Sequence, residues 1–126
     1  MLKKEGPGWR IIRDSSREHF PTLVGGESWA IELNKLEWES LVKLVIDLSD
    51  QYKDIKKQLM GDEDITLEME SNPWFAILQG DQYGWNLKLI LDSSDSFDRG
   101  AEFSWPREVT SNIVNAMRKM WDSDYL

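Results

Sequence analysis

The sequence predicts an α+β fold with two antiparallel sheets, each followed by a helix, in the order βββ-α-ββββ-α. Residues 35–60 and the segment after Pro106 both carry apolar side chains at helical spacing. The other segments alternate apolar and polar residues with the period of a strand. The links between the expected strands are short, which favours antiparallel hairpins. The chain of 126 residues is expected to form a single domain over residues 1–126.

The first part of the chain is expected to supply three strands before the first helix. Residues 1–7 are polar and contain glycine and proline, so a loose start is expected there. Residues 8–14 alternate imperfectly and predict the first strand, and residues 23–24 contribute a short second one. The glycine pair at 25–26 has the chemistry of a hairpin connection, after which residues 29–33 alternate as a third strand.

The first helix is expected to be the element around which the chain is organised. Asn34 is a suitable N-cap, and Glu37 can reach back to it in a capping box. Gly61 provides a left-handed residue that would end the helix after Met60. A sheet is the expected packing partner, and a coiled coil is the second interpretation. Apolar residues at alternating steps of three and four predict the buried face: Trp38, Leu41, Val45, Leu48, Tyr52, Ile55 and Leu59.

The second half of the chain predicts four strands. Residues 65–70 alternate cleanly, as in a half-buried strand, and an Asn-Pro pair at 72–73 makes the following turn. Residues 74–78 are apolar on both faces, as a central strand is. Residues 85–91 have a continuous apolar inner face, and residues 101–105 form a last short strand after a polar loop.

The second helix is expected to begin at Pro106, because the first helical position needs no amide hydrogen. Its buried face is predicted to hold Val109, Ile113, Met117 and Met120. We expect the two helices to pack together between the sheets. The two strand-plus-helix halves are interpreted as a structural pseudo-repeat.

Charge and composition limit the function classes. The net charge is −8, from 23 acidic and 15 basic residues, and such a surface repels polyanions at long range. Residues 1–20 are the exception, with a net charge of +2. The absence of cysteine excludes disulfides, thiolate metal sites and cysteine nucleophiles. No apolar stretch approaches the length of a membrane span, so we expect a soluble, cytoplasmic protein without a membrane role.

The polar motifs do not form a recognisable catalytic or metal-binding constellation. The glycine pair at 25–26 lacks a following helix and a Lys-Ser/Thr pair, so a hairpin turn is favoured over a phosphate loop. Asp92, Asp95 and Asp98 share one loop, but without the terminal Glu of a calcium loop they indicate a solvated loop. His19 is expected on the surface. We therefore assign no catalytic, cofactor-binding or metal residue and expect no cofactor.

Tryptophan and arginine provide the main indication of a binding surface. Seven tryptophans occur in this short chain, and nucleic-acid bases or a partner protein can pack on exposed aromatic side chains. The alternative is that the tryptophans close the ends of the core. The candidate binding surface consists of Trp9, Arg10, Arg13, Trp29 and Trp85.

An ordered set of short motifs covers nearly the whole chain: Gly8-Trp9-Arg10, Leu23-Val24-Gly25-Gly26-Glu27 with Trp29-Ala30 and Glu32, Ile65 with Glu68 and Glu70-Ser71, and Arg99-Gly100 with Glu102 and Trp105-Pro106. This set resembles a small family of cyanobacterial and plastid proteins of unknown function. That family is similar in fold to the Whirly-type single-stranded DNA-binding transcriptional regulators, in which two strand-plus-helix units pack with crossed helices. The lysine-containing motif of plastid Whirly proteins has no counterpart here, so no DNA-binding residue is carried over.

The first functional hypothesis is a non-enzymatic binding module, acting in regulation or assembly in a cyanobacterial-type cell, that binds a protein partner. Weak binding of single-stranded nucleic acid on the sheet surface is the alternative, because the resemblance favours it while the net charge opposes it. An enzyme acting on a small molecule is the third hypothesis. The sequence leaves the oligomeric state open. Arg99 is expected to have a structural role and to pair with an acid such as Glu68 or Glu70.

Overall fold

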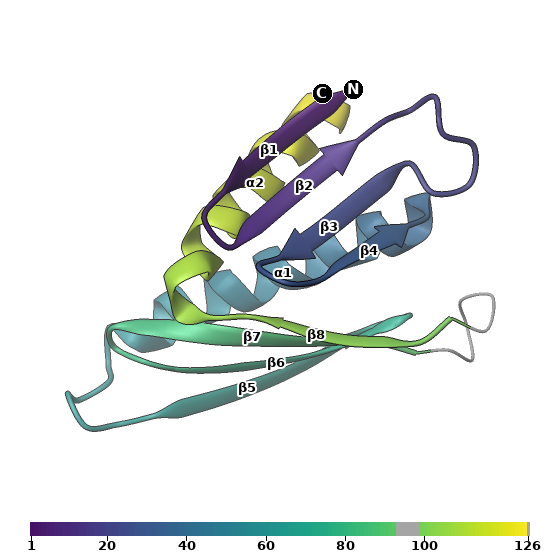
Figure 1. Ribbon diagram of the computed structural model, residues 1–126. Helices are drawn as coiled ribbons and strands as arrows, with labels where there is room; N and C mark the ends of the chain where they lie inside the picture. Colours follow the sequence, from purple (N-terminus) through teal and green to yellow (C-terminus); the bar gives the residue numbers. More distant parts are fainter. Residues whose placement is uncertain (93–98, 126) are drawn as a thin grey trace.

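The chain folds into two four-stranded antiparallel sheets with two helices between them (Figure 1). This computed structural model describes residues 1–92 and 99–125. The first sheet consists of β1 (Leu2–Gly6), β2 (Trp9–Arg13), β3 (Thr22–Gly26) and β4 (Ala30–Leu33), and the second of β5 (Ile65–Ser71), β6 (Trp74–Asp81), β7 (Gly84–Leu91) and β8 (Ala101–Trp105). The helices are α1 (Lys35–Lys56), which follows the first sheet, and α2 (Arg107–Tyr125), which follows the second.

The predicted α+β class and the two antiparallel sheets are confirmed, but four strands precede the first helix instead of three. The missed strand is β1, in the segment for which the sequence predicted a loose start. It pairs along its whole length with β2, from Leu2 opposite Arg13 to Gly6 opposite Trp9. Gly8 makes the tight turn between them with a φ of 81°. Because an edge strand has one pairing partner and little burial, β1 needs almost none of the apolar alternation that would reveal it.

Helix α1 begins as the sequence predicts. The Glu37 amide donates to Asn34 Oδ1 and the Asn34 amide donates to Glu37 Oε1, each over 2.8 Å, so the capping box is present. The predicted apolar stripe is buried from Trp38 to Tyr52. The helix packs against β5, β6 and α2, which confirms a sheet as its partner and removes the coiled-coil interpretation.

The predicted end of this helix at Met60 is wrong, because α1 stops at Lys56. The last two residues of the predicted stripe, Ile55 and Leu59, are only half-buried. Packing no longer supports the helix here, and the Leu59 amide donates over 3.2 Å to the carbonyl three residues back instead of four. Loss of tertiary contact ends the helix before Gly61 is reached.

The second sheet and its helix follow their prediction closely. The inward side chains of β6 and β7 are buried, among them Trp74, Ala76, Leu78, Trp85, Leu87, Leu89 and Leu91. Helix α2 starts at Arg107, one residue later than predicted. All four residues of its predicted face, Val109, Ile113, Met117 and Met120, are buried. Because α2 packs against β7 of one sheet and β2 of the other, both helices lie between the sheets as expected.

Glycine and tryptophan hold the two sheets together. In β3, a Cβ at Gly26 would collide with the indole nitrogen of Trp29, so only glycine fits. The glycine pair, which was expected to form the hairpin connection, lies inside β3 and pairs with β2, and the two residues after it form the turn. Trp105 of β8 donates from Nε1 to the carbonyl of Gly25 over 3.1 Å, and its ring lies 5.3 Å from that of Trp29. These contacts fix the β8 edge of the second sheet against the first.

Candidate functional site

The structure separates the two arginines of the predicted binding surface. Arg10 and Arg13 are three positions apart on β2, so they lie on opposite faces of the first sheet. Arg10 is exposed on the outer face. Arg13 donates from Nε to Thr22 Oγ1 over 3.1 Å, and its guanidinium carbon lies 5.3 Å from the ring centre of the buried Trp38. The two arginines therefore do not share one sheet face.

The three tryptophans of the predicted surface pack against the core. Trp85 is 4% exposed and belongs to the second sheet, where its ring lies 5.8 Å from that of Tyr52. Trp29 is half-buried, with its ring 4.3 Å from that of Phe103. Trp9 is half-buried at the start of β2. The predicted set is thus not assembled as one stacking platform, and its role in binding stays a prediction.

One residue of that set, Arg13, lines a cleft between the β2–β3 loop and the first turn of α1. The cleft has a volume of about 950 Å³. Its lining combines basic and apolar side chains, including Arg13, Arg17, Phe20, Pro21, Lys35 and Leu36. The lining residues include two arginines and one lysine but only one carboxylate, that of Glu18, so the lining is more basic than the protein as a whole, whose net charge is −8. Arg17 and Lys35 also pair with carboxylates outside the lining, those of Glu32 and Glu39. Such a lining favours an anionic or amphipathic ligand.

Hydrogen bonds hold the loop that forms one wall of the cleft. The Asp14 amide donates to the Pro21 carbonyl over 2.8 Å, and the Arg17 amide donates to the Asp14 carbonyl over 3.1 Å. The Asp14 carboxylate accepts from Oγ and the amide of Ser16, at 2.6 and 3.1 Å. The hydrogen bond from Ser16 Oγ is the main reason that the pKa of Asp14 lies below its ordinary value. The loop therefore presents Arg17 and Phe20 on a defined backbone.

Arg99 links this loop to α1 and β4. Its Nη1 donates to Glu37 Oε1 over 2.6 Å, and its Nη2 donates to the backbone carbonyl of Glu32. Its guanidinium carbon lies 4.6 Å from the ring centre of Phe20. The Glu32 carboxylate pairs in turn with Arg17 at 2.7 Å. Because Glu37 also caps α1, one carboxylate joins the start of the helix to the segment before β8.

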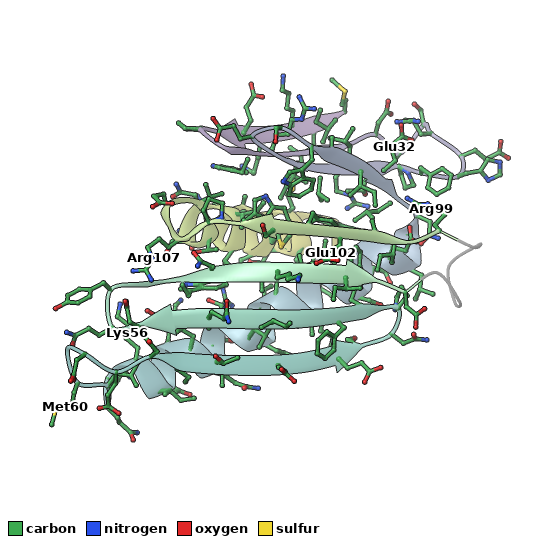
Figure 2. All side chains as sticks on the ribbon, turned by 60° about the horizontal axis from the view of Figure 1, so that its bottom comes forward. Glu32, Lys56, Met60, Arg99, Glu102 and Arg107 are labelled. Atoms are coloured by element: carbon green, nitrogen blue, oxygen red, sulfur yellow. The ribbon has the colours of Figure 1, made fainter. Side chains whose placement is uncertain are left out.

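Arg99 pairs with an acid as expected, but that acid is Glu37, and the two glutamates named as examples, Glu68 and Glu70, are wrong. Both glutamates are exposed on β5, at one edge of the second sheet, whereas Arg99 precedes β8 at the opposite edge. Figure 2 shows Arg99 beside Glu32 of the first sheet. The structural role expected for Arg99 is present, but its partners come from the other half of the chain.

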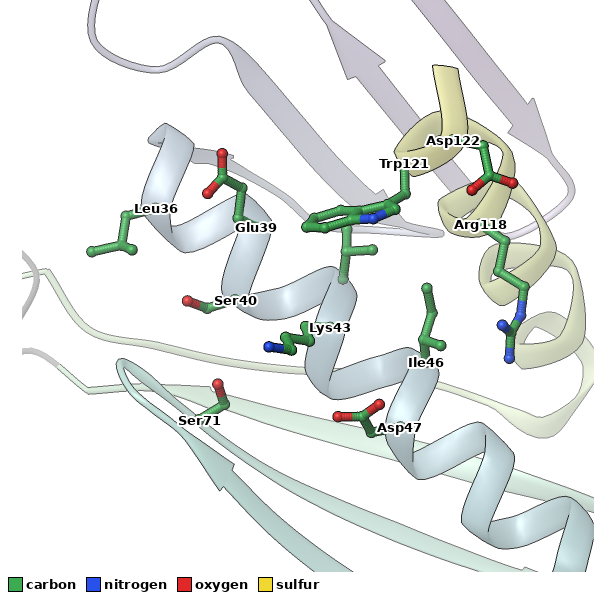
Figure 3. A pocket seen from close by; sticks show the side chains of 11 residues that line it. Leu36, Glu39, Ser40, Lys43, Ile46, Asp47, Ser71, Arg118, Trp121 and Asp122 are labelled. Carbon is green, nitrogen blue, oxygen red and sulfur yellow. The ribbon is translucent and has the colours of Figure 1, made fainter. Parts of the chain in front are cut away.

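A second hollow lies between α1 and the end of α2 (Figure 3). Its volume is about 630 Å³. Trp121 of α2 extends towards α1, and charged side chains of both signs, including Glu39, Lys43 and Arg118, surround the apolar ones. This groove is therefore mixed in character, in contrast to the basic cleft.

Leu36 lines both the cleft and the groove, and its side chain is 65% exposed. A single exposed leucine is ordinary on a protein surface. Leu36 differs in that it borders both the cleft and the groove, which makes the apolar surface there continuous. We define the cleft, the groove and Leu36 together as the α1 start surface.

Sequence reasoning did not single out Arg17, Phe20 or Leu36. For Leu36 a signal was available, because it precedes the buried stripe that begins at Trp38 and is out of phase with it. Phe20 is an aromatic residue inside a polar loop, which is typical of a loop that packs on its neighbours. Arg17 has no local signal, since its position depends on how the loop folds back.

The described residues do not assemble a metal site. Among the residues whose side chains are described, 1–92 and 99–122, no group of three His, Cys, Asp or Glu side chains is placed to hold an ion. Of the loop considered for calcium, Asp95 and Asp98 lie outside the described residues. The His19 side chain is 80% exposed and lies 4.0 Å from the Glu18 carboxylate. No described helix has both the length and the apolar composition that crossing a membrane requires.

A solved structure similar in sequence to this chain has the same fold. A crystal structure from Prochlorococcus sp. NATL2A, described as a protein with unknown function from the DUF155 family, matches with a TM-score of 0.93. The sequences are 70% identical, and the match covers 96% of this chain and 99% of that one. The predicted resemblance to cyanobacterial proteins of unknown function is confirmed, whereas the Whirly-type likeness stays a prediction.

The family comparison covers almost the whole chain. A search of curated proteins found none that matches this chain. Residues 4–120 match the family described as a domain of unknown function, DUF1818, and they include both sheets apart from the first two residues of β1, and most of α2. The protein therefore belongs to the DUF1818 family of domains of unknown function.

Proposed function

We propose that the protein is a non-enzymatic binding module, acting in regulation or assembly, and that its partner is another protein. The observation that carries this proposal is Leu36, exposed between the cleft and the groove. Protein interfaces place apolar side chains at their centre and polar ones at their rim, and the α1 start surface has this composition. Arg13, Arg17 and Lys35 on the cleft side favour an acidic side chain of the partner.

We also propose that the two halves form a pseudo-repeat of the Whirly type. The element order supports this, because each half consists of four strands followed by one helix. The packing of α1 against α2 supports it too. The similarity to a Prochlorococcus protein supports a cyanobacterial-type cell, and we propose the cytoplasm as the compartment.

The substitution Leu36→Asp tests the α1 start surface. Tagged wild-type and variant proteins are used to capture partners from a cyanobacterial extract, and retained proteins are identified by mass spectrometry. We expect a protein retained by the wild type to be reduced about tenfold or more with the variant, because burying an unpaired carboxylate in an interface costs several kcal/mol. Stability should hardly change, because this side chain is exposed in the free protein.

Met60→Asp is the matched control. Met60 is 67% exposed, and it follows the other end of α1, near Lys56 in Figure 2. The two variants carry the same added charge on a similarly exposed apolar residue. A partner retained equally by both variants, or lost equally from both, would remove the α1 start surface as its site.

Single-stranded nucleic acid is the second candidate ligand, and the grouping of Arg13, Arg17 and Lys35 with Phe20 in one cleft favours it. Cations can meet phosphates there while a base stacks on the ring. Because the net charge of −8 opposes a polyanion, we expect weak binding of oligothymidine that disappears as salt rises. At low salt, Arg13→Ala should weaken this binding, whereas Arg10→Ala on the outer face should not.

Binding is followed by the fluorescence anisotropy of labelled oligothymidine. Tryptophan emission is unsuitable here, because Arg13 lies over Trp38 and its replacement changes the environment of that ring directly. Circular dichroism establishes that both variants are folded. Absence of binding at low salt would exclude nucleic acid, and a loss caused by Arg10→Ala instead of Arg13→Ala would move the contact to the outer face.

A further inference from the structure

The two edges of the second sheet differ in how they are covered. Strand β8 lies against the first sheet, and its inward residues Phe103 and Trp105 are buried. Strand β5 is the other edge and, among the described strands, pairs only with β6. Its inward residues Ile65, Leu67 and Met69 are all only half-buried. The apolar inner row of the sheet is thus left incomplete at β5.

The β5 edge lacks several of the devices that block the addition of another strand, namely a short length, a bulge, proline and lysine. It is seven residues long and pairs with β6 without a bulge, from Ile65 opposite Gly80 to Ser71 opposite Trp74. It contains neither proline nor lysine. Because one antiparallel neighbour uses only half of a strand's backbone N–H and C=O groups, the other half of those in β5 point away from β6. These groups can pair with an additional strand.

The β5 edge is also strongly acidic. Residues 62–70 contain five acidic and no basic side chains. Glu68 and Glu70 are exposed on the outer face and alternate with the half-buried inward row. A strand placed beside β5 would hold the Cβ atoms of its outward side chains about 5 Å from those of the directly opposite glutamates, within reach of their carboxylates. Charge complementarity then selects Lys or Arg at its outward positions, and the incomplete inner row selects apolar residues at its inward ones.

We propose that the β5 edge is a strand-addition site for an extended segment of a partner protein in which Lys or Arg alternates with apolar residues. A second copy of this chain is a poor occupant. Antiparallel pairing of two β5 strands centred on Glu68 would set this carboxylate against its own copy, and like charges directly opposite each other are destabilising. The edge meets the α1 start surface only at Ser71, and its charge is the opposite of that of the cleft.

The test uses the whole chain and two labelled synthetic peptides of one composition. In the first peptide lysine alternates with valine, and in the second the lysines and valines form separate blocks. We expect the alternating peptide to bind, by fluorescence anisotropy, and to slow amide hydrogen exchange in residues 65–71. The affinity of the block peptide should be lower by about tenfold or more. Only alternation places the charges on one face of a strand and the apolar groups on the other.

Charge reversal on β5 provides the second arm. Glu68→Lys combined with Glu70→Lys should weaken binding of the alternating peptide by about tenfold or more, because attractive cross-strand pairs become repulsive. The matched control, Glu18→Lys combined with Glu27→Lys, makes the same change in net charge at exposed positions away from β5. It should leave the affinity within about twofold at moderate salt, where distant charges are screened.

Peptide binding at the β5 edge can be distinguished from partner binding at the α1 start surface. The Leu36→Asp variant should bind the alternating peptide with the affinity of the wild type. Equal binding of both peptides, or slowed exchange only outside residues 65–71, would reduce the interaction to general attraction by an acidic protein and overturn the proposal. Self-association of the chain alone that slows exchange in β5 would make a second copy the occupant and overturn it as well.

Discussion

Replacing Arg99 by methionine is expected to lower the free energy of unfolding by about 3 to 5 kcal/mol. Its partner Glu37 is a carboxylate in a residue that is only 1% exposed, at an Nη1–Oε1 distance of 2.6 Å. Without the guanidinium, this charge stays buried with less compensation. The substitution also removes the hydrogen bond to the Glu32 carbonyl and the contact with the Phe20 ring. Urea denaturation followed by circular dichroism measures the change.

Arg107→Met is the matched control for this substitution. Arg107 pairs with Asp81 at 3.4 Å, with side chains 39% and 24% exposed, and a pair of this kind contributes about 1 kcal/mol or less. Adding Glu37→Gln to the Arg99→Met protein should recover part of the loss, because a neutral amide no longer needs the cation. If Arg99→Met and Arg107→Met lowered the free energy of unfolding by similar amounts, the buried Arg99–Glu37 pair would have no special role.

The second large effect is expected in the core, where Leu48→Ala should cost about 2 to 5 kcal/mol. Leu48 is completely buried near the middle of the apolar stripe of α1. Removing most of its side chain leaves a cavity, because a helix packed against both a sheet and another helix relaxes only partly. The urea concentration at the denaturation midpoint should fall, while the slope of the unfolding free energy against urea concentration stays the same.

Leu36→Ala makes the same chemical change on the same helix and serves as its control. Because Leu36 is 65% exposed, its truncation should change the stability by about 0.5 kcal/mol or less. If Leu48→Ala and Leu36→Ala had equal midpoints, the interpretation of α1 as a buried central helix would fail. The pair of variants thus separates burial from any general effect of leucine on the helix.

Local patterns predicted much of the fold because the interactions behind them span only a few residues. The capping box of Asn34 and Glu37 requires two residues three positions apart, and it was recognisable without knowledge of the rest of the chain. The alternation in residues 65–70 and 85–91 similarly marked the inner face of each strand before its partner strand was known. Pro106 located the start of α2 to within one residue.

The candidate site was much less predictable. Strand periodicity already places Arg10 and Arg13 on opposite faces, so their separation follows from the sequence. The approach of the β2–β3 loop to α1, which makes the cleft, has no local pattern. The partner of Arg99 lies 62 positions away, and 23 acidic residues were available to it. Sequence chemistry indicated that Arg99 needs a carboxylate but contained no information on which one is near.

The sequence by itself determined the α+β class, the two helices, and the buried faces of α2, of most of α1 and of strands β5 and β7, because propensity and periodicity act within a few residues. Only the tertiary structure decided that β1 is a strand, since an edge strand depends on its neighbour more than on its own apolar residues. It also decided where α1 ends and that Leu36 stands exposed between two hollows. These features result from the packing of segments far apart in the chain, which no local pattern records.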